Sequence, residues 1–383
     1  MGDLFDELIK QESDIIIDEN MLHPIYVPER ILERDEQIEQ IVPTLRVVAK
    51  SQVPRHLYLF GSNGTGKTVT VRYLLRRLHD YAEFRDVYIF GSKSTTAYSV
   101  MKEIALECGC LTTEKDLPLH DMRRMVQDMI RASHNPVIIV LDECDYLKTS
   151  TYEEILQTLI GDDRSDSPHV CVISIANTVR ILSELDDPKV VSRYNPRNVE
   201  FPAYTGGELN DILRDRETAF YPGAIDELTI PFCAQTAVKN RNADARYALD
   251  LLSEAAEVAR LSGEKLVTIE CAKKAEQKLE TDYSLRPIVR LTDKMRWIFL
   301  VIALEEEQRI RDVVKRYNAD AKKHGEKPLR ESNIGYYLGV LERRGLIERG
   351  RRGKEGDRGV DWFVWVSPNL NREEILKAYE VDG

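Results

Sequence analysis

The stretch GSNGTGKT at residues 61–68 decides how this 383-residue sequence folds. It fits the pattern G-x-x-x-x-G-K-[ST] and lies between an apolar run at 57–60 and a segment with helical spacing at 67–79. In a strand, loop and helix of this kind, backbone N–H groups surround a phosphate, the lysine reaches the outer phosphates and the hydroxyl can ligate Mg2+. The loop residues expected to hold a nucleotide are Gly61, Asn63, Gly64, Thr65, Gly66, Lys67, Thr68 and Val69. The alternative, a chance glycine-rich turn, is disfavoured by this context.

Outward from this loop, short apolar runs alternate with helical segments. The apolar runs lie at 56–60, 87–90, 137–143 and 170–177, and the helices are predicted at 31–50, 67–79, 97–107 and 119–133. Unbroken apolar strands alternating with helices are typical of a parallel sheet covered on both faces. The predicted fold class is therefore α/β over residues 20–200.

Polar side chains end two of these runs. Asp142 and Glu143 follow a fully apolar strand, and Asn177 ends the next one. Ligands of parallel sheets bind at the carboxyl ends of the strands, so we expect Asp142 to hold Mg2+ together with Thr68, Glu143 to act as general base and Asn177 to orient the attacking water. The alternatives are a solvated acidic strand end and a turn-starting asparagine; the phosphate loop upstream favours the functional interpretation.

After residue 204 the strand-like runs stop. Four segments with helical spacing follow, at 206–220, 224–237, 243–262 and 268–282, with Gly-Gly, Pro-Gly and Ser-Gly between them. We expect a small helical domain here and a linker at 285–291, which carries Pro287. The predicted domains are a nucleotide-binding core at 1–202, a helical domain at 203–286 and a third domain at 287–383.

The third domain shows the pattern of a winged helix-turn-helix. Its last predicted helix carries a buried stripe made of Ile334, Leu338 and Leu341. We expect Ser332 to cap that helix and Gly345 to end it, and strands at 346–349 and 362–366 to pair across a glycine-rich turn.

The charge of the chain is divided between its parts. The net charge is −11, yet residues 287–383 hold 20 Lys and Arg against 17 Asp and Glu, and 343–358 hold seven basic against three acidic residues. This local excess favours DNA contact, whereas the alternative is a winged helix used for protein contacts with a solvated hairpin. Asn333, Tyr336, Tyr337, Arg343 and Arg344 are expected at the major groove, and Arg351, Arg352, Lys354 and Arg358 at the minor groove or backbone.

Several classes of protein are excluded by composition. No run of 18 apolar residues occurs, and the opening MGDLFDELIKQESD resembles no signal peptide, so we expect a soluble, cytoplasmic protein without a membrane partner. The six cysteines form no CxxC pair, which predicts neither zinc nor disulfides.

With GSNGTGKT, LDECD at 141–145 and IANT at 175–178 in that order, the sequence resembles the AAA+ ATPases. Within them it is similar to the archaeal replication initiators of the origin recognition complex and cell division cycle family. The resemblance rests on YVPERILERDEQI (26–38), VYIF (87–90) with STTAYSVMKEIALECG (94–109), FPAYTGGELNDILRDR (201–216), NADARYALDLL (242–252) and the winged-helix pattern.

The resemblance implies roles for residues that the spacing alone does not single out. Val27 and Pro28 would line the adenine, with nucleotide contacts from Tyr204 and Arg216, and Arg246 would be the second sensor, touching the outer phosphate from the helical lid. Arg193, with Arg197 as runner-up, would be the arginine presented to a neighbouring protomer's nucleotide. Residues 92–120, with Lys93, Lys102 and Lys115, resemble a helical insertion that helps to grip DNA.

The function implied is a DNA replication initiator that binds ATP or ADP with Mg2+ and hydrolyses ATP slowly, as a switch. Its expected partners are duplex DNA at the replication origin, the replicative helicase and other initiator protomers, within the nucleoid. The alternatives are a signalling NTPase whose winged helix makes protein contacts and a clamp-loader-like subunit; the basic winged helix and the lack of repeats up to Gly383 favour the initiator.

Overall fold

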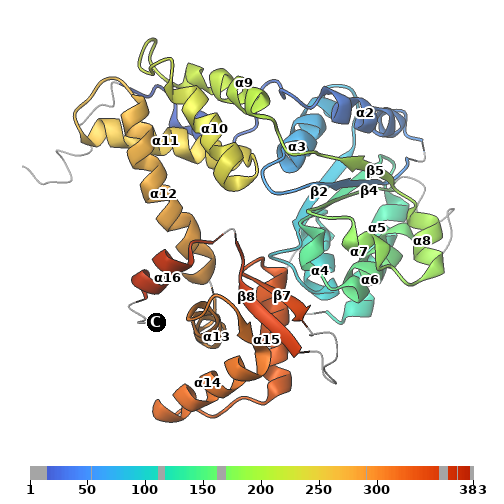
Figure 1. Ribbon diagram of the computed structural model, residues 1–383. Helices are drawn as coiled ribbons and strands as arrows, with labels where there is room; N and C mark the ends of the chain where they lie inside the picture. Colours follow the sequence, from blue (N-terminus) through green and yellow to red (C-terminus); the bar gives the residue numbers. More distant parts are fainter. Residues whose placement is uncertain are drawn as a thin grey trace, which may run out of the picture. The chain divides into compact units, whose positions relative to one another are not determined.

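The computed structural model describes residues 15–52, 54–110, 117–161, 170–289, 291–352, 361–368 and 370–379 (Figure 1). The chain divides into two compact units, Met1–Ile269 and Glu270–Gly383. Among the described residues, no helix is long and apolar enough to cross a membrane.

A five-stranded parallel sheet forms the centre of the first unit. Its strands are β1 (Leu57–Phe60), β2 (Arg85–Phe90), β3 (Val137–Asp142), β4 (Val170–Ala176) and β5 (Arg197–Glu200), in the order β2-β3-β4-β1-β5. The register pairs Phe90 with Asp142 and Phe60 with Ala176. The carboxyl ends of these strands therefore meet at one edge of the sheet, as the sequence predicts. The edge strand β5 was not predicted, because of its four residues only Val199 is buried.

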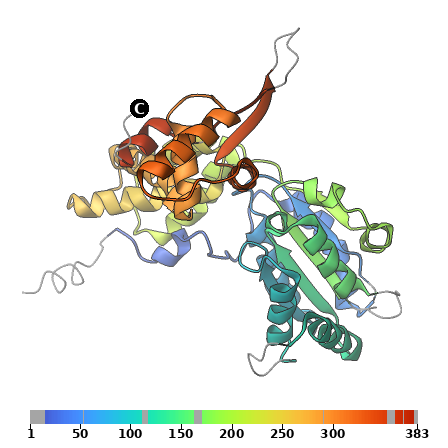
Figure 2. The same cartoon turned by 90° about the horizontal axis from the view of Figure 1, so that it is seen from below.

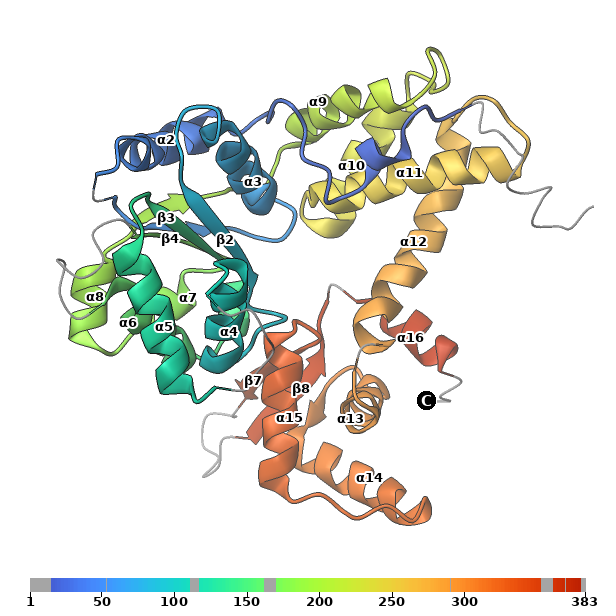
Figure 3. The same ribbon diagram turned by 180° about the vertical axis from the view of Figure 1, so that it is seen from behind.

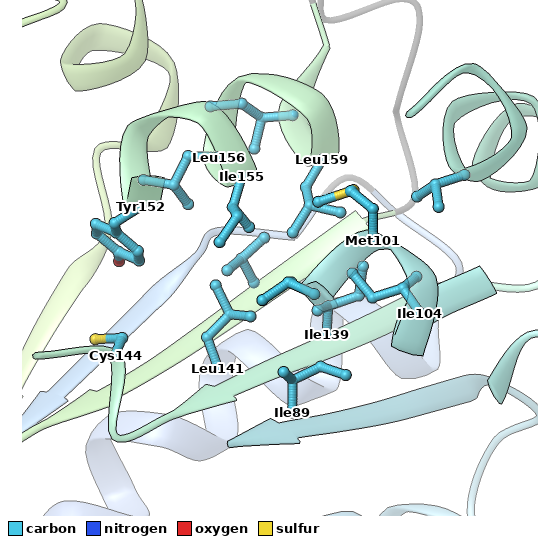
Figure 4. Close-up of a cluster of buried hydrophobic side chains, with 14 of the residues drawn as sticks. Ile89, Met101, Ile104, Ile139, Leu141, Cys144, Tyr152, Ile155, Leu156 and Leu159 are labelled. Atoms are coloured by element: carbon cyan, nitrogen blue, oxygen red, sulfur yellow. The ribbon is translucent and has the colours of Figure 1, made fainter. Parts of the chain in front are cut away.

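Helices cover both faces of this sheet. They are α2 (Asp35–Ala49), α3 (Lys67–Leu78), α4 (Ala97–Glu107), α5 (Leu119–Ala132), α6 (Thr149–Ile160), α7 (Arg180–Ser183) and α8 (Pro188–Tyr194). Because side chains alternate along a strand, Ile139 and Leu141 of β3 pack with α4 and α6, whereas Ile138 and Val140 pack in the separate cluster with α2 and α3. Figure 4 shows the first cluster, where Leu156 of α6 lies over the strand. A strand buried on both faces explains the continuous apolar run.

The rest of the first unit is helical. It contains α9 (Gly206–Arg216), α10 (Thr229–Arg241) and α11 (Ala245–Leu261), with the short 3-10 turns η1 (Glu19–Leu22) and η3 (Glu217–Ala219). A further 3-10 turn, η2 (Cys144–Tyr146), directly follows β3 of the sheet. Thr205 and Glu208 form a capping box at the start of α9. The N-terminal segment joins this helical part, since Ile17 N donates to Ala219 O at 2.7 Å. Figure 3 shows η1 beside α11.

The helix α12 (Ile269–Val289) includes most of the segment expected to be a linker. Pro287 lies inside it, near its C-terminal end, where the missing N–H removes only one backbone hydrogen bond. Ile288 and Leu291 are buried in the core of the second unit, so the helix is stabilised by packing beyond the proline. Residues 285–289 of the expected linker are therefore helical, and the linker itself stays a prediction.

The second unit has the predicted helices and hairpin. Its elements after α12 are α13 (Asp293–Ala303), β6 (Gln308–Arg309), α14 (Ile310–Lys323), α15 (Glu331–Arg343), β7 (Ile347–Arg352), β8 (Asp361–Val366) and α16 (Arg372–Ala378). The antiparallel sheet has the order β6-β8-β7, and Arg351 pairs with Trp362. The strands of the hairpin can be followed in Figure 2 by their orange-red colour. The stripe of Ile334, Leu338 and Leu341 is fully buried, as predicted.

The ends of α15 only partly follow the prediction. Gly345 adopts a φ of 68° just after the helix and ends it as expected. The N-cap is Arg330 rather than Ser332, which lies in the first turn of the helix. The prediction of Ser332 as cap is wrong because the helix begins two residues earlier than its side-chain chemistry suggested.

Candidate functional site

A cavity of about 360 Å3 lies in the first unit, between the phosphate loop and the helices α9 and α11. Thirteen residues that the sequence analysis singled out line it: Val27, Pro28, Gly64, Thr65, Gly66, Lys67, Thr68, Val69, Asp142, Glu143, Tyr204, Arg216 and Arg246. Gly61, Asn63, Asn177 and Arg193 are not part of this lining. Segments up to 219 positions apart in the chain, from Val27 to Arg246, thus meet around one space.

The phosphate loop has the backbone shape that its glycines permit. Gly66 precedes α3 with a φ of 88°, and a Cβ there would come within 2.5 Å of the Tyr204 hydroxyl. Lys67 is buried, and its Nζ donates to the carbonyl oxygens of Gly61 at 2.7 Å and Ser62 at 2.8 Å. Burial lowers the pKa of Lys67 to about 8. The loop therefore holds a lysine close to the position where its motif requires a cation.

The carboxylate of Asp142 is held by three donors. Thr68 Oγ1 donates to its Oδ2 at 2.8 Å, Tyr88 Oη donates to the same oxygen at 2.6 Å, and Glu143 N donates to Oδ1 at 2.9 Å. A hydroxyl and a carboxylate oxygen side by side are hard oxygen donors of the kind that Mg2+ prefers, so the residues present fit that ion. Tyr88 was missed by the sequence analysis, although the parallel pairing of β2 with β3 brings it beside this strand.

Glu143 lines the cavity, whereas Asn177 does not. Glu143 lines the cavity with a left-handed φ of 56°, a conformation that turns the chain sharply after β3. Asn177 instead donates through Nδ2 to Asp145 Oδ2 at 3.0 Å. The expected role of Asn177 in orienting the attacking water stays a prediction.

A buried arginine that the sequence analysis did not single out joins three segments of the site. Arg34 donates to the carbonyl oxygens of Thr65 at 2.9 Å, Glu33 at 2.7 Å and Pro202 at 2.8 Å. Its guanidinium lies 3.6 Å from the ring centroid of Tyr204, and burial lowers the pKa of Arg34. The only sequence signal for it was its place within the motif at 26–38.

The start of α11 touches the phosphate loop directly. Ala245 N donates to Gly64 O at 3.2 Å, and a Cβ on Gly64 would lie 1.8 Å from Asp244 Oδ1. Asp244 caps α11 by accepting from Arg246 N at 2.8 Å, and burial raises the pKa of Asp244. The Arg246 side chain is exposed and borders the cavity. Loop and lid are thus joined at Gly64.

The other end of the cavity is aromatic and basic. Arg216 has only 9% of its side chain exposed, lies 4.9 Å from the Tyr26 ring centroid and pairs with Asp215 at 2.7 Å. Its Nε is buried without a hydrogen-bond partner, and burial lowers the pKa of Arg216. The carbonyls of Val27 and Pro28 accept from Arg76 of α3, which fixes the N-terminal segment against the phosphate-loop helix.

Two arginines expected to act on a neighbour's nucleotide lie away from this cavity. Arg193 donates to Gly161 O at 2.7 Å, and Arg197 donates to Gln40 O at 3.0 Å. The insertion expected at 92–120 contains α4, whose Met101 is fully buried in the core. Lys93 is exposed and Lys102 half-buried, whereas Lys115 lies outside the described residues.

The residues expected to contact DNA lie in the second unit. Asn333, Tyr336 and Arg344 are exposed on α15 or just after it, and Tyr337 is half-buried beside Tyr336. Arg351 is exposed on β7 and lies 4.6 Å from the ring centroid of Trp362, which is 44% exposed. The remaining positions are Arg343 in α15, Arg352 in β7, and Lys354 and Arg358, of which the last two lie outside the described residues.

Comparison with known proteins agrees with this geometry. Residues 50–178 match the model of the AAA domain, and residues 210–277 match the model of the Cdc6 AAA+ ATPase-type lid domain. The sheet, the loop and the lid therefore define an AAA+ ATPase fold, which implies nucleotide binding. This confirms the predicted fold class: an α/β core, a helical lid and a C-terminal winged helix.

The chain is 31% identical to an ORC1-type DNA replication protein of Pyrococcus furiosus, over 92% of this chain and 89% of the relative. It is 34% identical to one of Pyrococcus horikoshii, over 80% and 75%. The chain belongs to the family of ORC1-type DNA replication proteins, and it is an initiator of the ORC1/Cdc6 type, as the sequence resemblance predicts.

Solved structures show the same fold. The Aeropyrum pernix ORC1 protein, solved in complex with DNA, has a TM-score of 0.82 and 26% identity, covering 97% of this chain and 98% of that one. Cdc6p from Pyrobaculum aerophilum has a TM-score of 0.63 at 23% identity, which shows the fold alone.

Proposed function

We propose that this chain is an ATP-switched initiator that binds duplex DNA at a replication origin and helps to load the replicative helicase. The observation that carries the nucleotide part is the Thr68 hydroxyl held 2.8 Å from the Asp142 carboxylate, beside the buried Lys67 and at the mouth of a cavity closed by lid residues. An AAA+ fold alone does not determine which nucleotide binds; these residues support ATP or ADP with Mg2+.

Each residue of the cavity has a distinct part in this proposal. Lys67 exchanges its bonds to the loop carbonyls for the outer phosphates, and the N–H groups at the start of α3 face the same anion. Thr68 and Asp142 would hold Mg2+, which supplies charge neutralisation of the phosphates when bound. Glu143 would accept the proton of the attacking water, and slow hydrolysis would then reset the switch.

The lid would communicate the state of the nucleotide. Arg246 borders the cavity at the start of α11, and the neighbouring Ala245 bonds to Gly64 of the phosphate loop. A charge at the outer phosphate attracts Arg246, so the two nucleotide states favour different positions of α11. Tyr204 and Arg216 lie at the entrance of the lid, where the Arg216 Nε has a hydrogen bond to give.

DNA binding is supported by the second unit. The similar Aeropyrum pernix protein was solved with DNA, and α15 here presents Asn333, Tyr336 and Arg344 to solvent. We assign α15 to the major groove and the β7–β8 hairpin to the adjacent backbone or minor groove. The same proposal includes three domains, at 1–202, 203–286 and 287–383. It also includes the replicative helicase and other protomers as partners and a location in the cytoplasmic nucleoid. We further propose that the insertion at 92–120 contacts DNA and that Arg193 or Arg197 acts on the nucleotide of a neighbouring protomer.

Two variants separate the nucleotide and DNA parts. Lys67→Ala removes the main cation facing the phosphates, so the affinity for a fluorescent ATP analogue should fall by at least tenfold. Arg344→Ala with Arg351→Ala removes two exposed cations, so the log-log salt slope of duplex binding should fall by up to about 1.8, or about 0.9 for each lost phosphate contact.

Each variant is the control for the other. Lys67→Ala should keep the salt slope of duplex binding, and the double variant should keep the affinity for ATP. Retention of ATP affinity within about threefold in Lys67→Ala would refute the nucleotide assignment. Duplex binding that shows no salt-dependent difference between wild type and double variant would place DNA elsewhere and favour protein contacts for the winged helix.

A further inference from the structure

The second unit has a stretch of positive excess before α15 in addition to the one around the hairpin. Residues 309–330 hold eight Lys and Arg against three Asp and Glu, compared with seven against three at 343–358. From residue 287 onward the remaining positions hold five basic and eleven acidic residues. The excess of positive charge is thus confined to two stretches, and the residues proposed to contact DNA include no basic residue of the first.

Four basic residues of the stretch 309–330 lie close together in the sequence, at its C-terminal end. They are Lys322, Lys323, Lys327 and Arg330, which we call the basic turn. All four are exposed, at the end of α14 and in the connection to α15. Lys323 pairs with Asp320 at 3.1 Å, whereas the other three have no ion-pair partner within the described ranges.

The basic turn has a fixed shape. Asn318 of α14 clamps the connection in both directions: its Nδ2 donates to Leu329 O at 3.0 Å, and its Oδ1 accepts from Leu329 N at 2.8 Å. Gly325 takes a φ of 75° and Glu326 N donates to Ala321 O at 2.8 Å, which closes the helix end. His324 packs edge-on against Trp297, with ring centroids 5.5 Å apart. The backbone that carries the lysines is therefore held in one conformation, so binding costs less backbone entropy than it would in a flexible loop.

The basic turn and Arg344 flank the same helix. Arg330 is the N-cap of α15 and Arg344 its C-cap, and at about 1.5 Å per residue the two ends lie about 20 Å apart. In Figure 3 the connection runs back along α14 before α15 begins. A helix lying in the major groove, which is about 12 Å wide, has a phosphate backbone beyond each of its ends. The cations at both ends of α15 are therefore placed where they could each contact one of the two phosphate backbones.

We propose that the basic turn binds the phosphate backbone of duplex DNA, on the opposite side of α15 from the β7–β8 hairpin. This inference rests on the proposed DNA-binding function and extends its footprint to a third element. The contacts are to phosphate, so they add affinity and fix the register of α15 without reading bases. DNA suits the basic turn better than an acidic protein surface because the turn adjoins the helix assigned to the groove and carries no apolar anchor.

The test is a salt series with duplex DNA and the full chain. The turn variant is Lys322→Ala, Lys323→Ala and Lys327→Ala together. The control variant removes three exposed lysines from other helices of the same unit: Lys274→Ala, Lys294→Ala and Lys377→Ala. Both variants change the net charge equally, so a general electrostatic effect would lower the salt slope of duplex binding equally in the two variants.

We expect the log-log salt slope to fall by about 0.9 to 2.7 in the turn variant and by clearly less in the control. In ethylation interference, a set of phosphates on one side of the site should matter for binding of wild type but not of the turn variant. The preference between duplex sequences should stay the same. Equal slopes for the two variants, with wild type still bound, overturn the inference. A wild type that binds no duplex at all overturns the DNA-binding proposal itself, so the two failures are distinguishable.

Discussion

Replacement of the buried Arg34 by Met should loosen the whole nucleotide site. The change removes hydrogen bonds to the carbonyls of Thr65 and Pro202, each contributing about 1.5–3 kcal/mol from a charged donor. It also removes the contact of the guanidinium with Tyr204 at 3.6 Å, about 1–2 kcal/mol in a desolvated place. Recovered desolvation of the charge offsets part of this loss, and we expect the free energy of unfolding to fall by about 3–5 kcal/mol.

Urea unfolding followed by far-UV circular dichroism measures this loss. Arg34→Lys keeps the charge but cannot reach both distant carbonyls, so most of the loss should remain. Arg46→Met changes an exposed arginine of α2 and should stay within about 0.5 kcal/mol of wild type. Nucleotide affinity should fall in the two Arg34 variants only, because Thr65 belongs to the phosphate loop. An Arg34→Met protein within about 1 kcal/mol of wild-type stability would refute the reasoning.

Three further perturbations test other residues. Glu143→Gln should retain nucleotide and lower single-turnover hydrolysis by at least about 100-fold, and an unchanged rate would remove Glu143 as base. Tyr88→Phe deletes a donor to Asp142, so half-maximal nucleotide binding should need about fivefold more Mg2+, with Tyr73→Phe as the control that should not differ from wild type. Burial lowers the pKa of His56 from 6.5 to about 4, so its contribution to stability is present above pH 6.5 and lost as the pH falls towards 4, up to about 3.4 kcal/mol. In urea unfolding, the free energy of unfolding should fall less between pH 7.5 and pH 4.5 in His56→Asn than in wild type. An equal fall in the two proteins would contradict this.

Much of the fold follows from local patterns. The strands β1 to β4 are continuous apolar runs, so the sequence predicts them almost to the residue, and the winged helix follows from one buried stripe and one hairpin. The edge strand β5 has no such pattern, because it contacts one neighbour and buries only Val199. The extension of α12 through Pro287 was not visible in the sequence, because a proline near a helix end is tolerated when packing continues beyond it.

The candidate site was predictable where a motif carries it. Thr68, Asp142 and the phosphate loop lie together as their spacing implies. Arg34 was not predictable, since its partners are backbone carbonyls 31 and 168 positions away, and any residue supplies a carbonyl. The basic turn was overlooked for another reason: its lysines are spread over a helix end and a turn, so no short window stands out.

The contact between His324 and Trp297 makes the basic turn observable by optical spectroscopy. The three tryptophans of the chain, at 297, 362 and 365, all belong to the second unit, so their emission reports on this unit and not on the ATPase core. Phosphates bound at the basic turn would lie close to His324, whose imidazole packs edge-on against the Trp297 indole with ring centroids 5.5 Å apart. When unlabelled protein is titrated with duplex DNA, the emission of Trp297 should therefore change, and His324→Asn should reduce that part of the signal.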